Sequence, residues 1–398
     1  MLNNTDEREL AHVERITRID RIPGADRVEL ATVLGWHVMV RRGQFKEGDL
    51  AIYIEIDSRC PPTEPFKFLE SKHYMVKTQR YFKGTVLSQG LLMSFEDVSL
   101  YASDYKEGDG LTEKLGIIYY EPEDNKRKAP HTDKYKLMAQ RNQKLFKKKP
   151  IRWLMRRNWG KKLLFLFFGR KKDKKRGWPE WVTKTDEIRL QSCPWILKED
   201  IVWTPSEKVD GSSCTVTIKR GKRDKHELYV CSRNVVMDTP DRANYYSDTI
   251  GRNIYWDAVI KYDIENVLKQ MLKDFPEQEW ITIQGEIYGD RVQKRNYGLS
   301  GDQQFAAFNL VMSNMSERSP YRWPTRSMKK LLEDKYGIPC VPIIGDDLKL
   351  PNDVDEVLKM ADGKSLIDGG DREGIVFRSS DGVESFKAVS NEYLLKYH

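Results

Sequence analysis

The sequence predicts an α+β protein in which a small N-terminal antiparallel β-barrel precedes a larger mixed α/β domain of antiparallel sheets with flanking helices. Residues from about 10 to 115 read as short strands separated by turns, with few helical periods. Beyond Trp178, strand patterns alternate with amphipathic helical patterns to the end of the chain. A strongly basic segment separates the two. We therefore predict three parts, 1–120 (barrel), 121–177 (basic linker or insertion) and 178–398 (larger domain).

The first part has turn signals at Pro23-Gly24-Ala25-Asp26 and between Gly43 and Gly48. Apolar runs lie around them, over 28–40, 50–56 and 85–93. This pattern suits a five-stranded OB-type barrel, the commonest small barrel attached to enzymes that act on nucleic acids. Tyr81 and Phe82 stand among cations in 77–84, where their rings could stack on bases. Packing inside the barrel is an equally good interpretation of these two rings.

The net charge of +8 is unevenly distributed. Residues 126–176 hold 21 Lys and Arg against only Asp133 and Asp173, a net +19, which leaves −11 for the rest of the chain. A basic block of this kind attracts a polyanion through counterion release, and we expect that polyanion to be nucleic acid. The acidic remainder suits a metal-dependent site.

The basic block contains an apolar hexamer, 163–168, with lysines and arginines on both sides. Six residues cannot cross a bilayer. Together with Ile151, Trp153 and Trp159, the hexamer could form a basic amphipathic surface for a membrane or RNA. Packing against the neighbouring domain is the favoured interpretation, because exposed apolar patches of that size are uncommon.

The chain reads as a soluble intracellular protein. No apolar run reaches the roughly 18 residues of a membrane span, and the polar, acidic N-terminus is unlike a signal peptide. The five cysteines are odd in number, far apart and without a Cys-x-x-Cys pair. We expect reduced thiols that lie mostly in the core.

Lys208 stands at a turn between two apolar runs, 201–203 and 214–218. Shielding from water and neighbouring cations would lower the pKa of its ammonium group towards neutrality and free a nucleophilic amine. Asp210 would point to the same side of a strand, where it could orient the amine or hold a metal-bound water. Gly211 would let the backbone turn. A solvated Lys-x-Asp-Gly turn is the commoner explanation of such a pattern taken alone.

The rest of the larger domain shows alternating strands and helices. Strands are predicted at 226–231, 280–289, 304–311, 372–378 and 384–389, one or two helices between 254 and 272, and further helices at 327–336 and 353–361. Glu286 and Glu373 lie in apolar strands, and either one alone would be read as an edge residue that faces water.

Six motifs in chain order change that interpretation, because together they closely resemble those of the covalent nucleotidyltransferases, the ATP-dependent ligases and capping enzymes. They are Lys208-x-Asp210-Gly211, Ser232-Arg233-Asn234, Gly285-Glu286, Phe305-x-x-Phe308-Asn309, Glu373-Gly374-Ile375-Val376-Phe377 and Phe386-Lys387. The N-terminal hundred residues resemble the OB module that precedes the catalytic domain in one nick-sealing RNA ligase family. The matching stretches there are Gly35-Trp36, Glu47-Gly48-Asp49, Glu55-Ile56-Asp57-Ser58, Lys77-Thr78-x-Arg80 and Ser88-Gln89-Gly90-Leu91.

The resemblance implies an ATP-dependent RNA ligase that uses Mg²⁺ or Mn²⁺ and acts on RNA ends or nicked RNA duplex, expected to be a monomer. Lys208 would attack the α-phosphate of ATP to form lysyl-AMP and release pyrophosphate. AMP would then pass to an RNA 5′-phosphate, and a 3′-OH would displace AMP to seal the strand. Each step is phosphoryl transfer, which depends mainly on in-line positioning and charge neutralisation.

The resemblance also implies roles for individual residues. Asp210, Glu286 and Glu373 would orient the lysine, bind ribose or organise the metal through water. Phe308 would stack on adenine, Arg233 would meet a phosphate or ribose, and Lys387 would neutralise the α-phosphate and depress the pKa of Lys208. Backbone groups around Glu207 would read the adenine edge, and Val209 and Val376 complete the predicted nucleotide-binding set.

Two departures from the family pattern stand out. The family often has a second lysine where Val389 stands here, so another cation, for example from the N-terminal barrel, would be needed. The basic block has no place in the family plan. Three alternatives stay open: an mRNA-capping guanylyltransferase, whose OB domain usually follows the catalytic domain, a DNA ligase, and a non-catalytic RNA-binding protein.

Overall fold

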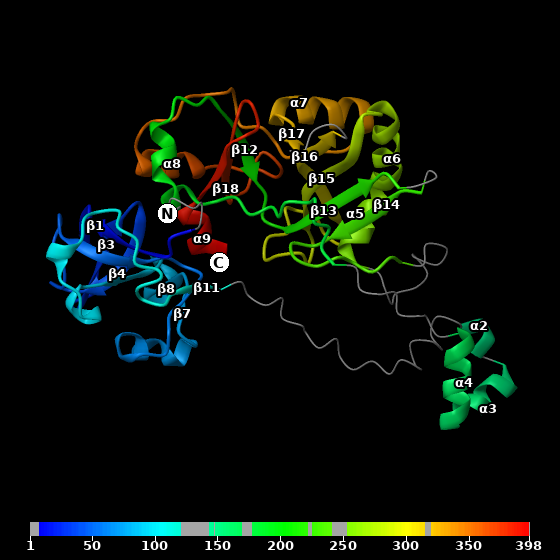
Figure 1. Cartoon of the computed structure of the whole chain (residues 1–398), viewed down its shortest axis with the longest axis horizontal. Helices are drawn as coiled ribbons and strands as arrows, with labels where there is room; N and C mark the ends of the chain where they lie inside the picture. Colours follow the sequence, from blue (N-terminus) through cyan, green and yellow to red (C-terminus); the bar gives the residue numbers. More distant parts are fainter. Residues whose placement is uncertain are drawn as a thin grey trace.

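The computed structural model describes residues 8–120, 143–146, 148–168, 177–221, 225–240, 253–314 and 320–397. Figure 1 shows a small β-rich N-terminal domain, a larger C-terminal domain built on two antiparallel sheets, and a helical unit that lies apart from both. The helical unit belongs to the basic block of the sequence.

The N-terminal domain is built from short antiparallel strands. They are β1 (Ala11–Arg15), β2 (Arg18–Arg21), β3 (Val28–Val33), β4 (Trp36–Arg41), β5 (Leu50–Ile54), β6 (Ser58–Arg59), β7 (Met75–Val76), β8 (Gln79–Tyr81), β9 (Val86–Ser88), β10 (Leu91–Met93) and β11 (Ile118–Tyr119). They form sheets in the orders β1-β5-β10, β2-β3-β4 and β11-β6-β7, and a β8-β9 pair. The apolar run 28–40 is a hairpin rather than one strand, because Leu34 and Gly35 both adopt positive φ.

The described part of the basic block is helical, with α2 (Gln143–Phe146), α3 (Lys149–Met155) and α4 (Asn158–Phe168). Gly160 lets α3 and α4 approach closely, since a Cβ there would lie 2.2 Å from the carbonyl oxygen of Leu154. The favoured interpretation of the apolar hexamer was wrong. Among the described residues, Leu164 is buried in a small cluster formed within 145–165, whereas Leu166 is 81% exposed.

The C-terminal domain contains two antiparallel sheets. The smaller has the order β12 (Trp203–Lys208), β18 (Gly374–Ser379), β19 (Ser385–Val389). The larger has the order β14 (Glu227–Cys231), β13 (Ser212–Lys219), β15 (Gln278–Gly289), β16 (Gln303–Asn314), β17 (Tyr321–Arg322). The chain passes from the smaller sheet to the larger sheet over residues 209–211, directly after Lys208. Side chains from both sheets can therefore reach the space around this crossing.

Helices cover these sheets and supply most of the core. α5 (Ile254–Lys261) and α6 (Ile264–Asp274) pack on the larger sheet with α7 (Thr325–Lys330), which continues as a π-helical turn over 331–335. α8 (Val354–Ala361) packs on the smaller sheet. The predicted helical patterns are confirmed, and caps explain two starts: the side chain of Asn253 accepts the amide of Trp256, and Asp353 accepts that of Glu356.

A short C-terminal helix, α9 (Asn391–Tyr397), was not predicted, and it lies between the two domains (Figure 1). Leu394 and Val389 form an apolar cluster with Leu87 of β9. The guanidinium of Arg80 donates to the carbonyl oxygen of Leu395. Val389, at the position where the related pattern often has a lysine, therefore packs in the interface with the N-terminal domain.

All five cysteines are buried and unpaired, which confirms the expectation of reduced core thiols. Within the described ranges, none of the helices combines the length and the apolar character needed to cross a bilayer.

Candidate active site

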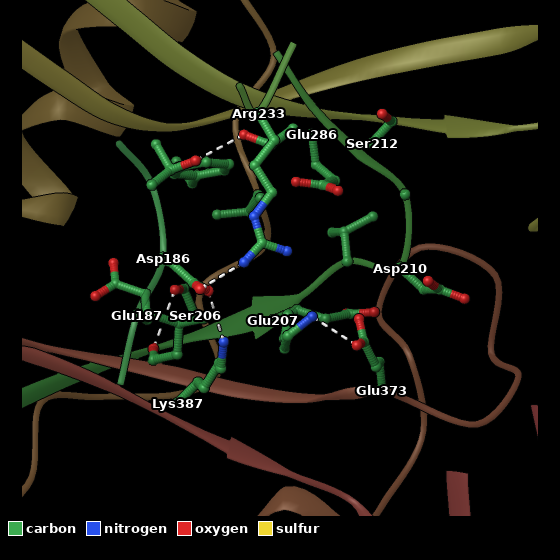
Figure 2. A pocket seen from close by; sticks show the side chains of 18 of the residues that line it. Asp186, Glu187, Ser206, Glu207, Asp210, Ser212, Arg233, Glu286, Glu373 and Lys387 are labelled. Carbon is green, nitrogen blue, oxygen red and sulfur yellow. Dashed lines mark hydrogen bonds and ion pairs between the residues drawn. The ribbon is translucent and has the colours of Figure 1, made fainter. Parts of the chain in front are cut away.

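A cavity of about 360 Å³ opens between the two sheets of the C-terminal domain, a size typical of small-molecule sites. Figure 2 shows side chains from both sheets pointing into it. Every residue that the sequence singled out as a site residue lines this cavity: Glu207, Lys208, Val209, Asp210, Arg233, Glu286, Phe308, Glu373, Val376 and Lys387. The fold thus gathers ten positions spread over 181 residues of chain around one space.

Strand pairing brings Lys208 and Glu373 together. Lys208 ends β12 and pairs with Gly374, the first residue of β18, so Glu373 directly precedes its cross-strand partner. Glycine is required at two neighbouring positions by close backbone approach: a Cβ on Gly211 would lie 2.2 Å from the carbonyl oxygen of Ile287, and one on Gly374 at the same distance from that of Ala388. The Lys-x-Asp-Gly and Glu-Gly patterns therefore reflect tight packing beside the reactive groups.

The amine of Lys208 donates a 2.5 Å hydrogen bond to Oε1 of Glu373, and 24% of the lysine side chain is exposed to the cavity. Burial disfavours its ammonium form, but Glu373, Glu286 and Asp210 outweigh burial and raise the pKa of Lys208. The predicted lowering of this pKa was therefore wrong for the ligand-free protein. Oε2 of Glu373 is buried with no hydrogen-bond partner in the described part of the chain, so it can accept a donor or a cation.

Glu286 reaches the same space from β15. Burial, together with the negative charges of Glu373 and Asp210, raises the pKa of Glu286 to about 8, although Lys208 acts in the opposite direction. Within the described ranges, no three His, Cys, Asp or Glu side chains converge closely enough to form a ready metal cage. A crowded carboxylate group with one orphaned oxygen nevertheless suits a cation such as Mg²⁺, which keeps several of its waters and uses few protein ligands.

Asp210 is held from two sides by tyrosines that the sequence did not reveal. Tyr393 of α9, which is fully buried, donates a 2.8 Å hydrogen bond to Oδ2 of Asp210. Burial and the Asp210 carboxylate raise the pKa of Tyr393, so its hydroxyl stays a donor. The backbone amide of Asp210 donates to the hydroxyl of Tyr297 at 2.7 Å. Both the position and the orientation of this carboxylate are fixed before any ligand binds.

At the opposite end of the cavity, two cations share one carboxylate (Figure 2). Oδ1 of Asp186 accepts from Nζ of Lys387 at 3.0 Å, and Oδ2 accepts from the guanidinium of Arg233 at 2.5 Å. Burial works against the Asp186 carboxylate, but Lys387 and Arg233 outweigh it and lower the pKa of Asp186. Burial, with the nearby charges of Lys208 and Arg189, lowers the pKa of Lys387 despite Asp186.

The aromatic ring of Phe308 also lines the cavity. The β15–β16 register passes from Gln284 paired with Asn309 to Gly285 paired with Ala307, which leaves Phe308 as the extra residue of a β-bulge. Phe308 packs with Val209 and Val341 in one apolar cluster, and the guanidinium of Arg378 lies 5.7 Å from its ring centroid. A ring in this position offers a face for stacking a flat ligand.

The carboxylate of Glu207 is already hydrogen-bonded within the protein. Its two oxygens accept from the hydroxyl of Ser365 at 2.5 Å and from the amide of Leu366 at 2.7 Å. Its backbone amide donates to the carbonyl oxygen of Pro342. Glu207 therefore anchors the loop at 365–366, and its amide is not available for reading an adenine edge.

Sequence reasoning missed several lining residues, among them Thr185, Asp186, Glu187, Gln293 and Arg378. Asp186 and Glu187 lie in a stretch without regular structure, where no periodicity marks them. Arg378 offered a signal, because a cation directly follows the Glu-Gly-Ile-Val-Phe run in a strand. It is buried and donates to Glu187 and Ser206.

Comparisons with known proteins agree with this geometry. Residues 201–398 match the RNA ligase family model, and residues 10–95 match an OB-fold domain model, which confirms the predicted fold of both parts. No curated protein matches the chain.

Solved structures of Naegleria gruberi RNA ligase cover 98% of the chain with 99% of their own length. A mutant with AMP and Mn is 26% identical with a TM-score of 0.65, and the enzyme with pyrophosphate is 27% identical with a TM-score of 0.64. A mutant with ATP and Mn is 28% identical with a TM-score of 0.64.

Proposed function

The chain belongs to the RNA ligase family, and from that premise we propose that it joins RNA 3′-OH and 5′-phosphate ends in an ATP-dependent reaction through lysyl-AMP and RNA-adenylate. The observation that carries this proposal is Lys208, a lysine open to a cavity of nucleotide size and hydrogen-bonded to Glu373. The order of the domains supports ligation, since capping enzymes usually place their OB domain last.

In the first step, the neutral amine of Lys208 attacks the α-phosphorus of ATP, a P–N bond forms, and the bond to pyrophosphate breaks. The amine must first lose its proton, for which Glu373 is the adjacent acceptor. When bound, Mg²⁺ or Mn²⁺ supplies positive charge near Asp210, Glu286 and Glu373 that offsets these carboxylates and lowers the pKa of Lys208. The hydrogen bond from Tyr393 fixes the orientation of the Asp210 carboxylate for this role.

The cationic end of the cavity suits the phosphates. Lys387 and Arg233 already neutralise one carboxylate, and an incoming phosphate can share or replace Asp186 as their partner. Arg189 supplies the additional cation that the valine at position 389 cannot. Its guanidinium lies 5.5 Å from the ring centroid of Trp36 in the N-terminal domain and contributes to the lowered pKa of Lys387. Phe308 is the proposed stacking surface for adenine.

The proposal is tested by incubating the protein with α-labelled ATP or GTP and a divalent metal, and measuring label retained on the denatured chain. We expect ATP to label the wild type and a Lys198→Ala control, a variant of an exposed lysine outside the cavity, and not Lys208→Ala. The loss should exceed roughly 10³-fold, since the amine of Lys208 is the group to which AMP becomes bonded in this proposal. Labelling by GTP alone would select capping, and no labelling would select a binding protein.

We further propose that the natural substrate class is a nick in duplex RNA and that the chain acts as a monomer. It predicts faster sealing of a nicked RNA duplex than of a nicked DNA duplex or two single-stranded RNA ends by the wild-type protein. Sedimentation under the assay conditions should give the mass of one chain. Faster sealing of the DNA nick would show that the substrate is DNA rather than RNA, and it would leave the proposal of lysyl-AMP chemistry unchanged.

A further inference from the structure

The helical unit in the basic block has no part in the chemistry described above, yet it is an organised structure. α3 and α4 cross at Gly160 and enclose a small core in which Phe146 and Leu164 are buried. The ring of Phe168 meets that of Phe146 edge-on at 6.2 Å between centroids. The unit is therefore folded on its own cluster, and its outer surface is available for another purpose.

That outer surface carries a second apolar face. Trp159, Leu163, Leu166 and Phe167 follow the spacing i, i+4, i+7, i+8 along α4, which places them on one side of the helix. Their exposed fractions are 53%, 45%, 81% and 71%. We call these four residues the exposed stripe. Trp153 of α3, 49% exposed, continues it, since its ring meets that of Trp159 at 6.2 Å between centroids.

Exposed cations stand close to the exposed stripe along the chain. Over residues 143–168 the sequence holds nine Lys and Arg and no Asp or Glu. Arg152, Arg156, Arg157 and Lys162 are exposed, and the guanidinium of Arg157 lies 4.1 Å from the ring centroid of Trp153. An apolar helix face with aromatic and leucine side chains, bordered by cations without acids, has the composition of helices that lie in the plane of a membrane interface.

We propose that the α3–α4 hairpin docks on the surface of an anionic phospholipid membrane, with the exposed stripe inserted among the acyl chains and the surrounding lysines and arginines on the headgroups. α4 has 11 residues, about 16 Å in length, so it lies along the surface rather than across it. The docking goes beyond RNA ligation and would place the ligase at a membrane.

Lipid fits these features better than the other anionic partners. RNA offers phosphates for the cations and bases for Trp153 and Trp159, but it offers nothing for the aliphatic Leu163 and Leu166. An acidic protein would need charges spaced to match, whereas a leaflet of anionic lipid presents uniform negative charge above an apolar layer about 15 Å deep. Nine cations with no acidic residue among them suit that uniform charge.

The test is sedimentation of the full chain with sucrose-loaded vesicles, either of phosphatidylcholine alone or with added phosphatidylserine. We expect the partition coefficient to be at least about tenfold higher for the anionic vesicles, because several cations approach the headgroups together. Leu166→Glu/Phe167→Glu, in the exposed stripe, should lower binding to the anionic vesicles at least about tenfold by placing two carboxylates in the interface.

The matched control is Phe68→Glu/Tyr101→Glu, which alters two apolar side chains of the N-terminal domain that are 59% and 76% exposed. It adds the same charge and should bind vesicles like the wild type. Lysyl-AMP formation by all three proteins verifies that the catalytic domain is folded. Equal binding to both vesicle types, or wild-type binding by the stripe variant, would overturn the proposal. Loss of RNA binding by the stripe variant with retention of vesicle binding would assign the hairpin to RNA instead.

Discussion

The two ends of the cavity hold one lysine each, and these lysines behave in opposite ways. Lys208 faces three carboxylates, which raise its pKa. Lys387 shares a single carboxylate, Asp186, with Arg233 and lies near further cations, so its pKa is lowered. Burial acts in the same direction on both amines, so the local ratio of acids to bases decides the outcome. The end at Lys208 is short of positive charge and suits a metal ion. The end at Lys387 is short of negative charge and suits phosphate.

Among the variants that test this contrast between the two ends, we expect the largest effect from Glu373→Gln. Gln keeps the shape and an acceptor but removes the charge beside Lys208, so we expect lysyl-AMP formation to fall about 10²-fold or more, with a higher metal concentration needed for half-maximal rate. The measurement is single-turnover labelling with ATP across a metal titration. Glu384→Gln, an exposed carboxylate before β19, should behave as wild type. Normal labelling by Glu373→Gln would remove this glutamate from the reaction.

At the other end, Lys387→Met should affect the nucleotide rather than the metal. Loss of the cation leaves the phosphates less well neutralised, so we expect labelling to fall about tenfold to 10²-fold, mainly through a higher KM for ATP. The measurement is the initial rate as a function of ATP concentration at saturating metal. A change in metal requirement with unchanged KM would contradict the assignment of phosphate to this end. Lys198→Ala serves again as the control.

A smaller effect is expected from Tyr393→Phe, which removes only the hydroxyl that fixes Asp210. We expect the rate of RNA sealing to fall about tenfold. A tenfold change corresponds to about 1.4 kcal/mol, which is close to the contribution of one hydrogen bond to a charged group. Tyr397→Phe, in the same helix, is the matched control and should seal normally. Sealing rates are measured together with melting temperatures.

The combination with Asp210→Asn tests whether Tyr393 acts through the aspartate. If it does, Tyr393→Phe should cost little more in the Asp210→Asn background, because the two residues form one unit. A full additional tenfold loss there would mean that Tyr393 acts by another route.

The smallest effect is expected on stability. Because the folded-state pKa of Glu286 is raised from 4.5 to about 8, its contribution to the free energy of unfolding is fully present below about pH 4.5 and is lost as pH rises through about 8. Glu286→Gln does not titrate, so its melting temperature should exceed that of the wild type at pH 8 by about 2 °C or more and approach it near pH 4.5.

This comparison is made without metal or nucleotide, since either would change the charge around Glu286. Glu279→Gln, a partly exposed residue of the same strand that pairs with Lys219, should show a much smaller pH-dependent difference. An identical pH profile for Glu286→Gln and wild type would show that Glu286 is not held in the crowded, buried environment described above.

Much of the site was readable from the sequence because its residues occupy fixed places relative to strands. Lys208, Glu286 and Glu373 each interrupt or end an apolar run, and glycines beside two of them mark close backbone approach. Asp186 and Tyr393 could not be found in this way. Asp186 lies in an irregular segment and Tyr393 in a short helix, and each acquires its role only through contact with a residue distant in the chain.

The sequence by itself determined the chemistry available, namely a lysine, three carboxylates, an aromatic ring and a second lysine in a fixed strand order, because local periodicity dictates which residues form strands and where those strands end. Only the tertiary structure decided how these charges balance. The pKa of Lys208 depends on how many carboxylates surround it, and Glu373 and Glu286 reach it only through the pairing of β12 with β18 and of β13 with β15. The same holds for the apolar hexamer, whose residues are divided between a core and a solvent-exposed face by a helix crossing at Gly160 that no local pattern specifies.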